Sequence, residues 1–288
     1  MSIAHCDSNA SGRIRRSLGL LLALLLVAWT GSIQAQAARY AAKDYPPDIR
    51  RILERGELVV AIPMWDLSPF FFAKDGQLQG VDIETAQGLA KALGTKVRFD
   101  RNAASFDEVV DVVARGDADL GIAELSRTLP RSLRVRFSEP YLVLHHALLI
   151  NRLRLAALTV GKDAELVIKH FPGVIGVRGK SSYVGFAGDY FPGAKLVEYP
   201  DWDAAVRAVK AGQIDALYSD ELDVKGVIRM DPRNALVLKP VVFTDTRDAL
   251  SIAVHPDSHQ LLSFTNLYLA QRAKVLDIET LLKLGAAQ

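Results

Sequence analysis

The sequence predicts an α/β protein built from two doubly wound lobes. Short apolar runs typical of buried strands alternate with segments of helical periodicity, and this alternation occurs in two successive series along the chain. The joints between the segments are short, which favours parallel βαβ units. With 288 residues, 50% of them hydrophobic and 24% charged, the chain has an ordinary globular composition and is long enough for one large domain or two small ones.

The first 37 residues have the pattern of a secretory signal peptide. Three arginines precede an apolar run at residues 18–29, and small residues follow it up to an A-x-A sequence at residues 35–37. A membrane anchor is the alternative, but the apolar run has about 12 residues where a spanning helix needs about 20. We therefore expect residues 1–37 to be removed and the remainder to be exported to the periplasm.

Charge and cysteine content argue against several classes of function. Residues 1–37 contain three Arg and one Asp, so their removal brings the formal net charge from +2 to zero. We therefore infer neither a nucleic-acid partner nor a membrane-surface partner. The single cysteine, Cys6, lies ahead of the apolar run and is not placed as a lipoprotein cysteine. Residues 38–288 contain no cysteine, so no disulfide, thiolate nucleophile or cysteine metal site is expected.

The first series of elements begins after the signal peptide. Asp75-Gly76 between two apolar runs is typical of a hairpin turn. Ser105 precedes a helical segment and has Glu108 three residues on, which is the spacing of a capping box. The predicted elements, in order, are a helix at 45–56, a strand at 57–63, a hairpin at 65–82, a helix at 83–93, a strand at 96–99, a helix at 106–113 and a strand at 118–123.

The second series is flanked by apolar strands at residues 143–150 and 250–254. The C-terminal segment, residues 260–284, is predicted to be helical throughout. These observations divide the chain into the signal peptide (1–37), a first lobe (38–144), a second lobe (145–245) and a return to the first lobe (246–288). Within the second series we predict strands at 174–177, 195–199, 216–219 and 235–242 and helices at 182–190, 202–211 and 221–230.

Ser126, Thr128 and Arg131 form a candidate anion receptor. They follow the predicted strand at 118–123 in a Ser-x-Thr-x-x-Arg spacing. An arginine presents a rigid fork of donors that fits a carboxylate, and the two hydroxyls add further donors. The alternative is a solvated basic loop, because three other arginines stand between residues 127 and 136.

This segment and the following Phe137-Ser138-Glu139-Pro140-Tyr141 together resemble the signature of the family 3 periplasmic solute-binding proteins, the amino-acid receptors of bacterial ABC importers. The resemblance extends from residue 57 to the C-terminus. It implies a two-lobed type II periplasmic-binding-protein fold, in which two doubly wound sheets are joined by two crossover strands. In that family, the residues that match Ser126, Thr128 and Arg131 hold the α-carboxylate of the ligand.

The second lobe supplies two further candidates. Ser181, with Ser182 beside it, opens a predicted helix, where hydroxyl and backbone N–H groups favour an anion. The family uses this segment on the ligand carboxylate, and Lys180 stands where the family has a glycine. Asp220 matches the second aspartate of the family's Asp-Ala-x-x-x-Asp motif, which takes the ligand's ammonium group. Simple helix capping is the alternative for both Ser181 and Asp220.

Two aromatic residues and one carboxylate complete the predicted site. Phe106 matches a family position that stacks on the ligand side chain, and Trp65 lies in a loop where another ligand-facing aromatic is usual. Plain core packing is the alternative for each. Glu124 stands where the family has a small residue such as glycine. Its role is left open between an internal partner for Arg131 or Arg127, a receptor for a cationic ligand side chain and a catalytic acid.

We therefore expect a periplasmic substrate-binding protein that captures an amino acid or a similar small zwitterion by hinge closure and delivers it to a membrane ABC permease. It is expected to be a monomer that uses no cofactor, and its histidines lack a metal-binding spacing. Two alternatives stay open. One is an enzyme on the same fold that resembles cyclohexadienyl or prephenate dehydratases, with Glu124 as general acid. The other is a ligand-sensing partner of a membrane receptor.

Overall fold

The computed structural model describes residues 41–272 and 277–286. The chain divides into two units, with the boundary between Pro46 and Pro47. In the described part of the first unit, the 3₁₀ helix η1 (Ala42–Asp44) is closed by the Asp44 carboxylate, which accepts from the Ala41 amide at 2.9 Å. The expected signal peptide, residues 1–37, lies outside the described residues.

The first sheet of the second unit is mixed. Its strands, in spatial order, are β4 (Lys96–Ala103), β1 (Glu57–Pro63), β5 (Leu120–Gly121), β12 (Ala253–Val254) and β6 (Arg136–Phe137). β1 pairs in parallel with β4 and β5, whereas β12 is antiparallel to both of its neighbours. Residues 58–63 of β1 are all buried, as expected for a strand covered on both faces.

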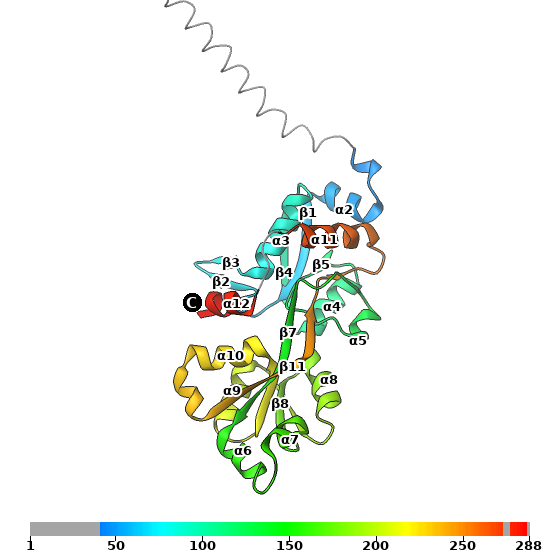
Figure 1. Cartoon of the computed structure of the whole chain (residues 1–288). Coiled ribbons are helices and arrows are strands. Elements are labelled where there is room, and N and C mark those ends of the chain that lie inside the picture. Colours follow the sequence, from blue (N-terminus) through cyan, green and yellow to red (C-terminus); the bar gives the residue numbers. More distant parts are fainter. Residues whose placement is uncertain (1–40, 273–276, 287–288) are drawn as a thin grey trace, which may run out of the picture. The chain divides into compact units, whose positions relative to one another are not determined.

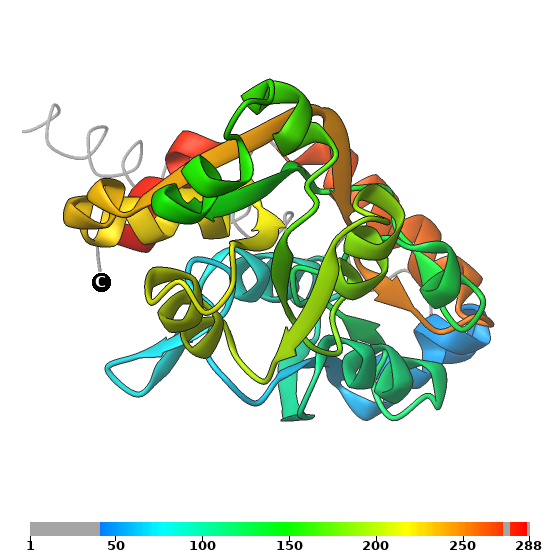
Figure 2. The same ribbon diagram turned by 90° about the horizontal axis from the view of Figure 1, so that it is seen from below.

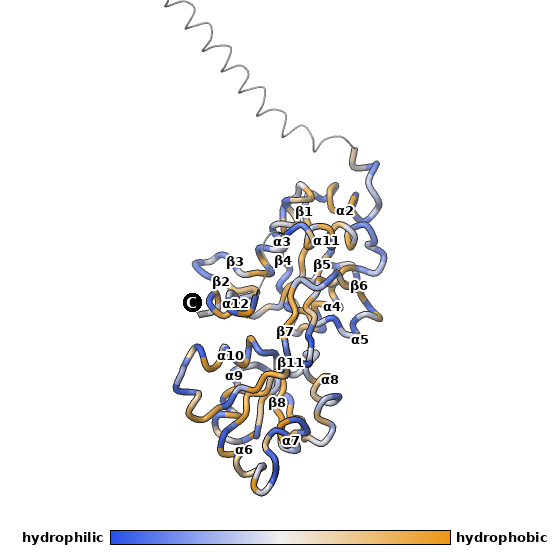
Figure 3. The backbone as a smooth tube through the Cα atoms, in the orientation of Figure 1, coloured by the Kyte–Doolittle hydropathy of each residue, from blue (hydrophilic) through white to orange (hydrophobic). Residues whose placement is uncertain are grey.

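The second sheet contains the two longest strands of the described chain. Its strands, in spatial order, are β11 (Leu238–Leu250), β7 (Leu142–Asn151), β10 (Ala216–Asp220), β8 (Val174–Arg178) and β9 (Lys195–Tyr199). β8, β9 and β10 are parallel to one another, and β7 is antiparallel to β10 and β11. Successive residues of β7 belong to separate buried clusters on the two faces, Leu148 and Ile150 on one and Ala147 and Leu149 on the other. In both sheets, most strand segments are accordingly hydrophobic (Figure 3).

Helices cover both sheets, and short ones occupy several connections. Those that bear on the site are α3 (Val81–Ala92), α4 (Phe106–Ala114), α5 (Leu129–Ser132), α8 (Ser182–Tyr190), α9 (Trp202–Lys210) and α10 (Glu221–Met230). The others are α2 (Pro47–Arg55), α6 (Arg152–Leu158), α7 (Ala164–Lys169), η2 (Pro232–Leu236), α11 (His259–Gln271) and α12 (Ile278–Ala286), and a hairpin of β2 (Phe72–Lys74) and β3 (Gln77–Gln79) precedes α3. α2 packs against α11, and α10 packs against α12. Within the described residues, no helix is long and apolar enough to cross a membrane.

The chain passes between the two sheets twice. It leaves the first sheet after β6 along β7, and it returns along β11 to β12. Figures 1 and 2 show β7 and β11 side by side, and the two strands are hydrogen-bonded partners. Their register shifts between Phe243 and Asp248, so β11 bulges at this point. Asp248 follows the bulge directly, and the bulge can re-aim its side chain toward the first sheet.

The predicted fold class, two doubly wound sheets joined by two crossovers, is confirmed. Most predicted elements are present, but three expectations are wrong. Residues 235–236 belong to η2 and not to a strand, and the strand predicted at 118–123 is reduced to β5. The segment 260–284 is not helical throughout, because α11 ends at Gln271 and Asp277 also lies outside a helix. The lobe boundaries at 144/145 and 245/246 stay a prediction, since β7 and β11 each run continuously across one of them.

Candidate ligand-binding site

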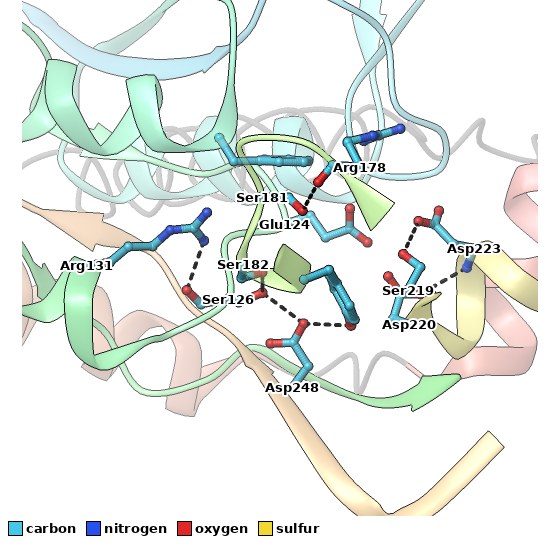
Figure 4. A pocket seen from close by; sticks show the side chains of 12 residues that line it. Glu124, Ser126, Arg131, Arg178, Ser181, Ser182, Ser219, Asp220, Asp223 and Asp248 are labelled. Carbon is cyan, nitrogen blue, oxygen red and sulfur yellow. Dashed lines mark hydrogen bonds between the residues drawn. The ribbon is translucent and has the colours of Figure 1, made fainter. Parts of the chain in front are cut away.

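A small polar cavity lies where loops from the two sheets meet (Figure 4). The first sheet contributes residues from α4 and from the segment after β5. The second contributes residues at the ends of β8 and β10, residues at the starts of α8 and α10, and Asp248 of β11. This is the carboxyl edge of parallel strands, where α/β sheets bind ligands. The cavity measures about 30 Å³, room for about one or two water molecules. It is lined by Phe106, Glu124, Ser126, Arg131, Arg178, Ser181, Ser182, Tyr183, Ser219, Asp220, Asp223 and Asp248.

Arg131 is buried at one side of this cavity, with 6% of its surface exposed. Its Nε and Nη2 donate to Asp107 Oδ1 at 3.0 and 2.8 Å, and its Nη1 donates to the Ser126 carbonyl at 3.2 Å. A guanidinium has five N–H donors. One N–H therefore remains on each terminal nitrogen, which is what a bidentate carboxylate needs.

Ser126 connects the two sheets through a hydroxyl network. Its Oγ lies 2.8 Å from Ser182 Oγ and donates to Asp248 Oδ2 at 2.8 Å. Asp248 Oδ2 also accepts from the Tyr183 hydroxyl at 3.0 Å. Residues after β5, at the start of α8 and on the returning strand β11 therefore meet at one carboxylate. Moving the two sheets apart would break the contact between Ser126 and Ser182.

Asp220 and Asp223 lie at the opposite side of the cavity from Arg131, with Glu124 between (Figure 4). Asp220 is the last residue of β10, and its Oδ1 accepts from the amides of Leu222 and Asp223 at 2.8 and 2.9 Å. The predicted alternative of helix capping is therefore observed for Asp220, which lines the cavity as well. Asp223 accepts from Ser219 Oγ at 2.8 Å. Burial raises the pKa of both carboxyl groups, and their mutual repulsion adds to this effect for Asp220.

Glu124 has a backbone conformation that is unusual for a residue with a side chain. Its φ is 49°, in the left-handed region that glycine adopts without strain. Its amide donates to the buried Asp82 carboxylate at 2.9 Å, which holds the turn. Its Oε1 is buried and has no hydrogen-bond partner in the described part of the chain. Desolvation, followed by repulsion from Asp220 and Asp223, raises the pKa of Glu124 well above its ordinary value.

Replacing Glu124 with glycine is expected to raise the melting temperature of the ligand-free protein by roughly 2–8 °C. The substitution removes about 1–2 kcal/mol of left-handed strain, and each kcal/mol corresponds to about 2–4 °C in a protein of this size. Glu124→Ala is the matched control, because it removes the carboxylate but keeps the strain. If the glycine variant melts no higher than the alanine variant in differential scanning calorimetry, the strain is absent.

The other predicted polar residues take different positions. Ser181 lines the cavity, but its Oγ donates to the Arg178 carbonyl at 2.7 Å rather than capping α8. Lys180 has a φ of 54°, which explains why a glycine is suited to this position. Thr128 is not among the lining residues. Its hydroxyl caps α5 by accepting from the Arg131 amide at 3.4 Å, so it positions Arg131.

The two predicted aromatic residues lie beside a second, larger cavity of about 460 Å³. Phe106 lines both cavities, whereas Trp65 lines the larger one only and packs edge-on against Phe106 with ring centroids 5.5 Å apart. The Arg178 guanidinium lies 5.7 Å from the centre of the Phe106 ring. The larger cavity is lined by Trp65, Ala104, Ser105, Phe106, Arg178, Gly179, Lys180, Glu198, Tyr199, Pro200 and Asp201.

The structure therefore brings together six of the eight predicted residues and adds several that sequence reasoning missed. The charged ones are Arg178, Asp223 and Asp248. Arg178 could have been found as the residue directly after the strand predicted at 174–177, and Asp223 as the residue one turn beyond Asp220. Asp248 carries no such signal, because it lies 122 positions from Ser126 and its orientation depends on the bulge in β11.

Burial of several carboxyl groups predicts that the ligand-free protein loses stability as the pH rises from 6 to 8. Burial raises the pKa of Asp82 to about 7 and that of Asp248 to about 6, and Glu124, Asp220 and Asp223 are also raised. Such a group keeps its proton in the folded state at a pH where the unfolded chain has lost it. Stability therefore falls as the pH increases through this window.

His146 acts in the opposite direction, because desolvation lowers its pKa to about 4, but it affects stability mainly below pH 6.5. The measurement is the melting temperature of the ligand-free protein at pH 6 and at pH 8. The Glu124→Gln variant is expected to show a smaller difference between the two temperatures than the wild type. A melting temperature that rises between these values would contradict the prediction.

The carboxylates do not form an evident metal centre. In residues 41–272 and 277–286, no group of three or more His, Cys, Asp or Glu side chains has a geometry that could hold a metal ion. What the cavity does present is a cation with free donors at one side and, at the other, acid groups that form no ion pair with the described residues. This arrangement suits a small molecule that carries both a carboxylate and an ammonium group.

The chain is similar in sequence to a family of solute-binding proteins and to individual amino-acid-binding proteins. Residues 59–167 match the model of bacterial extracellular solute-binding proteins, family 3. The chain is 28% identical to the glutamine-binding protein of Geobacillus stearothermophilus, over 64% of this chain and 68% of that protein. It is 26% identical to the ABC transporter arginine-binding protein 1 of Escherichia coli (strain K12), over 68% and 76%.

A solved structure and one enzyme complete the comparison. An amino acid ABC transporter substrate-binding protein from Streptococcus pneumoniae, bound to L-arginine, superimposes with a TM-score of 0.66 at 26% identity, covering 84% of this chain and 98% of that one. The membrane-bound lytic murein transglycosylase F of Maricaulis maris is 32% identical over 46% of this chain, but only 31% of that enzyme is covered.

Proposed function

Because this chain belongs to the family 3 extracellular solute-binding proteins, we propose that it is the substrate-binding component of an ABC importer for a basic α-amino acid. The observation that carries the proposal is the cavity itself, in which Arg131 faces the carboxyl groups of Glu124, Asp220 and Asp223. The arginine-bound neighbour and the arginine-binding relative support a cationic ligand, and the glutamine-binding relative supports an α-amino acid more generally.

Each end of the ligand would then have its own partners. The two free N–H groups of Arg131 would take the α-carboxylate, assisted by the hydroxyls of Ser126 and Ser181. Asp220 would take the α-ammonium group. Glu124 and Asp223 would neutralise the cationic side chain of the ligand. This side chain would pack against the rings of Phe106 and Trp65. Thr128 acts indirectly, by fixing the turn that carries Arg131.

Binding requires the two lobes to open and close. A cavity of about 30 Å³ does not hold an amino acid, so the Ser126–Ser182 contact must break before the ligand enters. Bending at β7 and β11, which join the two sheets, would allow this opening. The closed, loaded form would then be presented to a membrane permease, with the protein residing in the periplasm as a monomer after removal of the signal peptide.

A thermal-shift screen of the purified protein against the twenty amino acids, ornithine, dicarboxylates and prephenate tests the proposal. A compound that binds only the folded state raises the melting temperature by mass action. We expect shifts with L-arginine, L-lysine or L-ornithine and smaller ones with neutral amino acids. Shifts confined to acids that lack an amino group would contradict the proposal and indicate a carboxylate receptor.

The buried Glu124 also favours one enzymatic alternative. A carboxyl group with a raised pKa and an unpaired oxygen inside a cleft can act as a general acid, as an enzyme resembling the dehydratases would require. Such an enzyme would convert prephenate to phenylpyruvate, with loss of water and carbon dioxide. Incubation with prephenate, followed by ultraviolet absorbance, separates the two functions, and we expect no turnover.

A further inference from the structure

Arg178 occupies an unusual position between the two cavities. It ends β8 and lines both of them, and its guanidinium lies over the Phe106 ring. The ion pairs formed by the described residues do not include this guanidinium. Arg131, by contrast, is fixed by Asp107. Arg178 is therefore a charged side chain in the cleft that no ionic partner anchors.

The charge of Arg178 acts on the carboxyl groups of the small cavity. Its positive charge lowers the pKa of Glu124 and of Asp223, in opposition to the effect of burial. These are the two carboxyl groups that the proposed function assigns to the ligand's cationic side chain. A bound basic amino acid and Arg178 would therefore compete for the same negative charge.

The larger cavity offers Arg178 a second location. It has a volume of about 460 Å³ and is lined by the carboxylates of Glu198 and Asp201. Glu198 lies close to the backbone beside Arg178, since its Oε2 is 2.9 Å from where a Cβ on Gly179 would stand. The three aromatic side chains Trp65, Phe106 and Tyr199 also line this cavity, and such rings favour a guanidinium that lies on their faces.

We propose that Arg178 is a built-in counter-ion of the ligand pocket, which a cationic ligand displaces into the larger cavity toward Glu198. Arg178 would then determine specificity. It would reduce the affinity for basic amino acids and leave the affinity for neutral amino acids largely unchanged. This inference rests on the proposed function, because it requires that the ligand be a cation.

The test is calorimetric titration of L-arginine and L-glutamine into three forms of the protein at one salt concentration. Arg178→Met keeps the length of the side chain but removes its charge, and it is expected to bind L-arginine on the order of tenfold more tightly than the wild type. Arg178→Lys keeps the charge and is expected to stay within about twofold of the wild type. Weaker or unchanged L-arginine binding by Arg178→Met would overturn the proposal, as would an equal gain for L-glutamine.

A second substitution tests whether Glu198 is the partner of the displaced Arg178 guanidinium. Glu198→Gln is expected to weaken L-arginine binding in the wild-type background, because the displaced guanidinium loses a partner, and to have no effect in the Arg178→Met background. Equal effects in both backgrounds would overturn the displacement. The proposed function and the role of Arg178 are refuted by different results. If the wild type binds no basic amino acid, the proposed function is wrong, whereas wild-type binding without a gain in Arg178→Met refutes the role of Arg178 alone.

Discussion

Replacing Asp220 with asparagine is expected to weaken L-arginine binding by about two to three orders of magnitude, because truncating one side of a buried charge pair costs about 2–5 kcal/mol. Asp220 has two functions in this account, capping α10 and receiving the ammonium group. Asparagine is as good an N-cap as aspartate, so Asp220→Asn removes the charge and retains the cap. Isothermal titration calorimetry measures the affinity, and thermal unfolding verifies that the helix is intact.

Asp215→Asn is the matched control for this experiment. Asp215 lies just before β10, is 4% exposed, and accepts from Arg154 Nε at 2.5 Å and from the Val174 amide at 2.7 Å, outside the cavity. Its substitution should lower stability and leave the affinity unchanged. Wild-type affinity in Asp220→Asn would mean that Asp220 serves α10 alone and that the ammonium group is held elsewhere.

Arg131→Met is expected to lower the affinity for every α-amino acid by at least about two orders of magnitude. The change keeps the apolar stem and removes the donors that the α-carboxylate requires, and charge-assisted hydrogen bonds contribute about 1.5–3 kcal/mol each. Titration calorimetry with L-arginine and L-glutamine measures the loss, which should be similar for both because both carry the α-carboxylate.

Asp107→Asn distinguishes this role from a structural one. The Arg131–Asp107 ion pair joins α5 to the first turn of α4, and each substitution breaks it. If Arg131 were only structural, both variants would lose stability and neither would lose affinity once folded. In our account Asp107→Asn still binds, because Arg131 remains in the cavity.

The elements that the sequence predicted well are those with local causes. The Ser105 cap of α4 is present, with its Oγ accepting from the Glu108 amide at 3.1 Å, and the turn at Asp75-Gly76 joins β2 to β3 as the dipeptide indicates. Apolar runs such as residues 57–63 and 143–150 form largely buried strands, because their spacing of apolar residues does not favour an amphipathic helix. Two of the errors concern the short elements η2 and β5, and the short helices α5, α6 and α7 were not predicted at all. The few residues of such elements give weak periodicity.

The site was predictable in outline but not in its electrostatics. Motif spacing located Ser126, Arg131, Ser181 and Asp220, which all line the cavity. It could not locate Asp248, whose position depends on a bulge far along the chain. The strain at Glu124 also follows from long-range packing, since the amide of this residue is held by Asp82, 42 positions earlier.

The most direct test of the central claim compares L-arginine with L-citrulline, its neutral isostere, by calorimetry on the purified protein at pH 8. The two ligands share the α-carboxylate and α-ammonium groups and differ only in the charge that Glu124 and Asp223 would neutralise. Our account predicts that L-arginine binds at least about tenfold more tightly, as expected when a charge is paired inside a protein. Equal binding, or tighter binding of L-citrulline, would show that the acidic cavity does not select a cationic ligand.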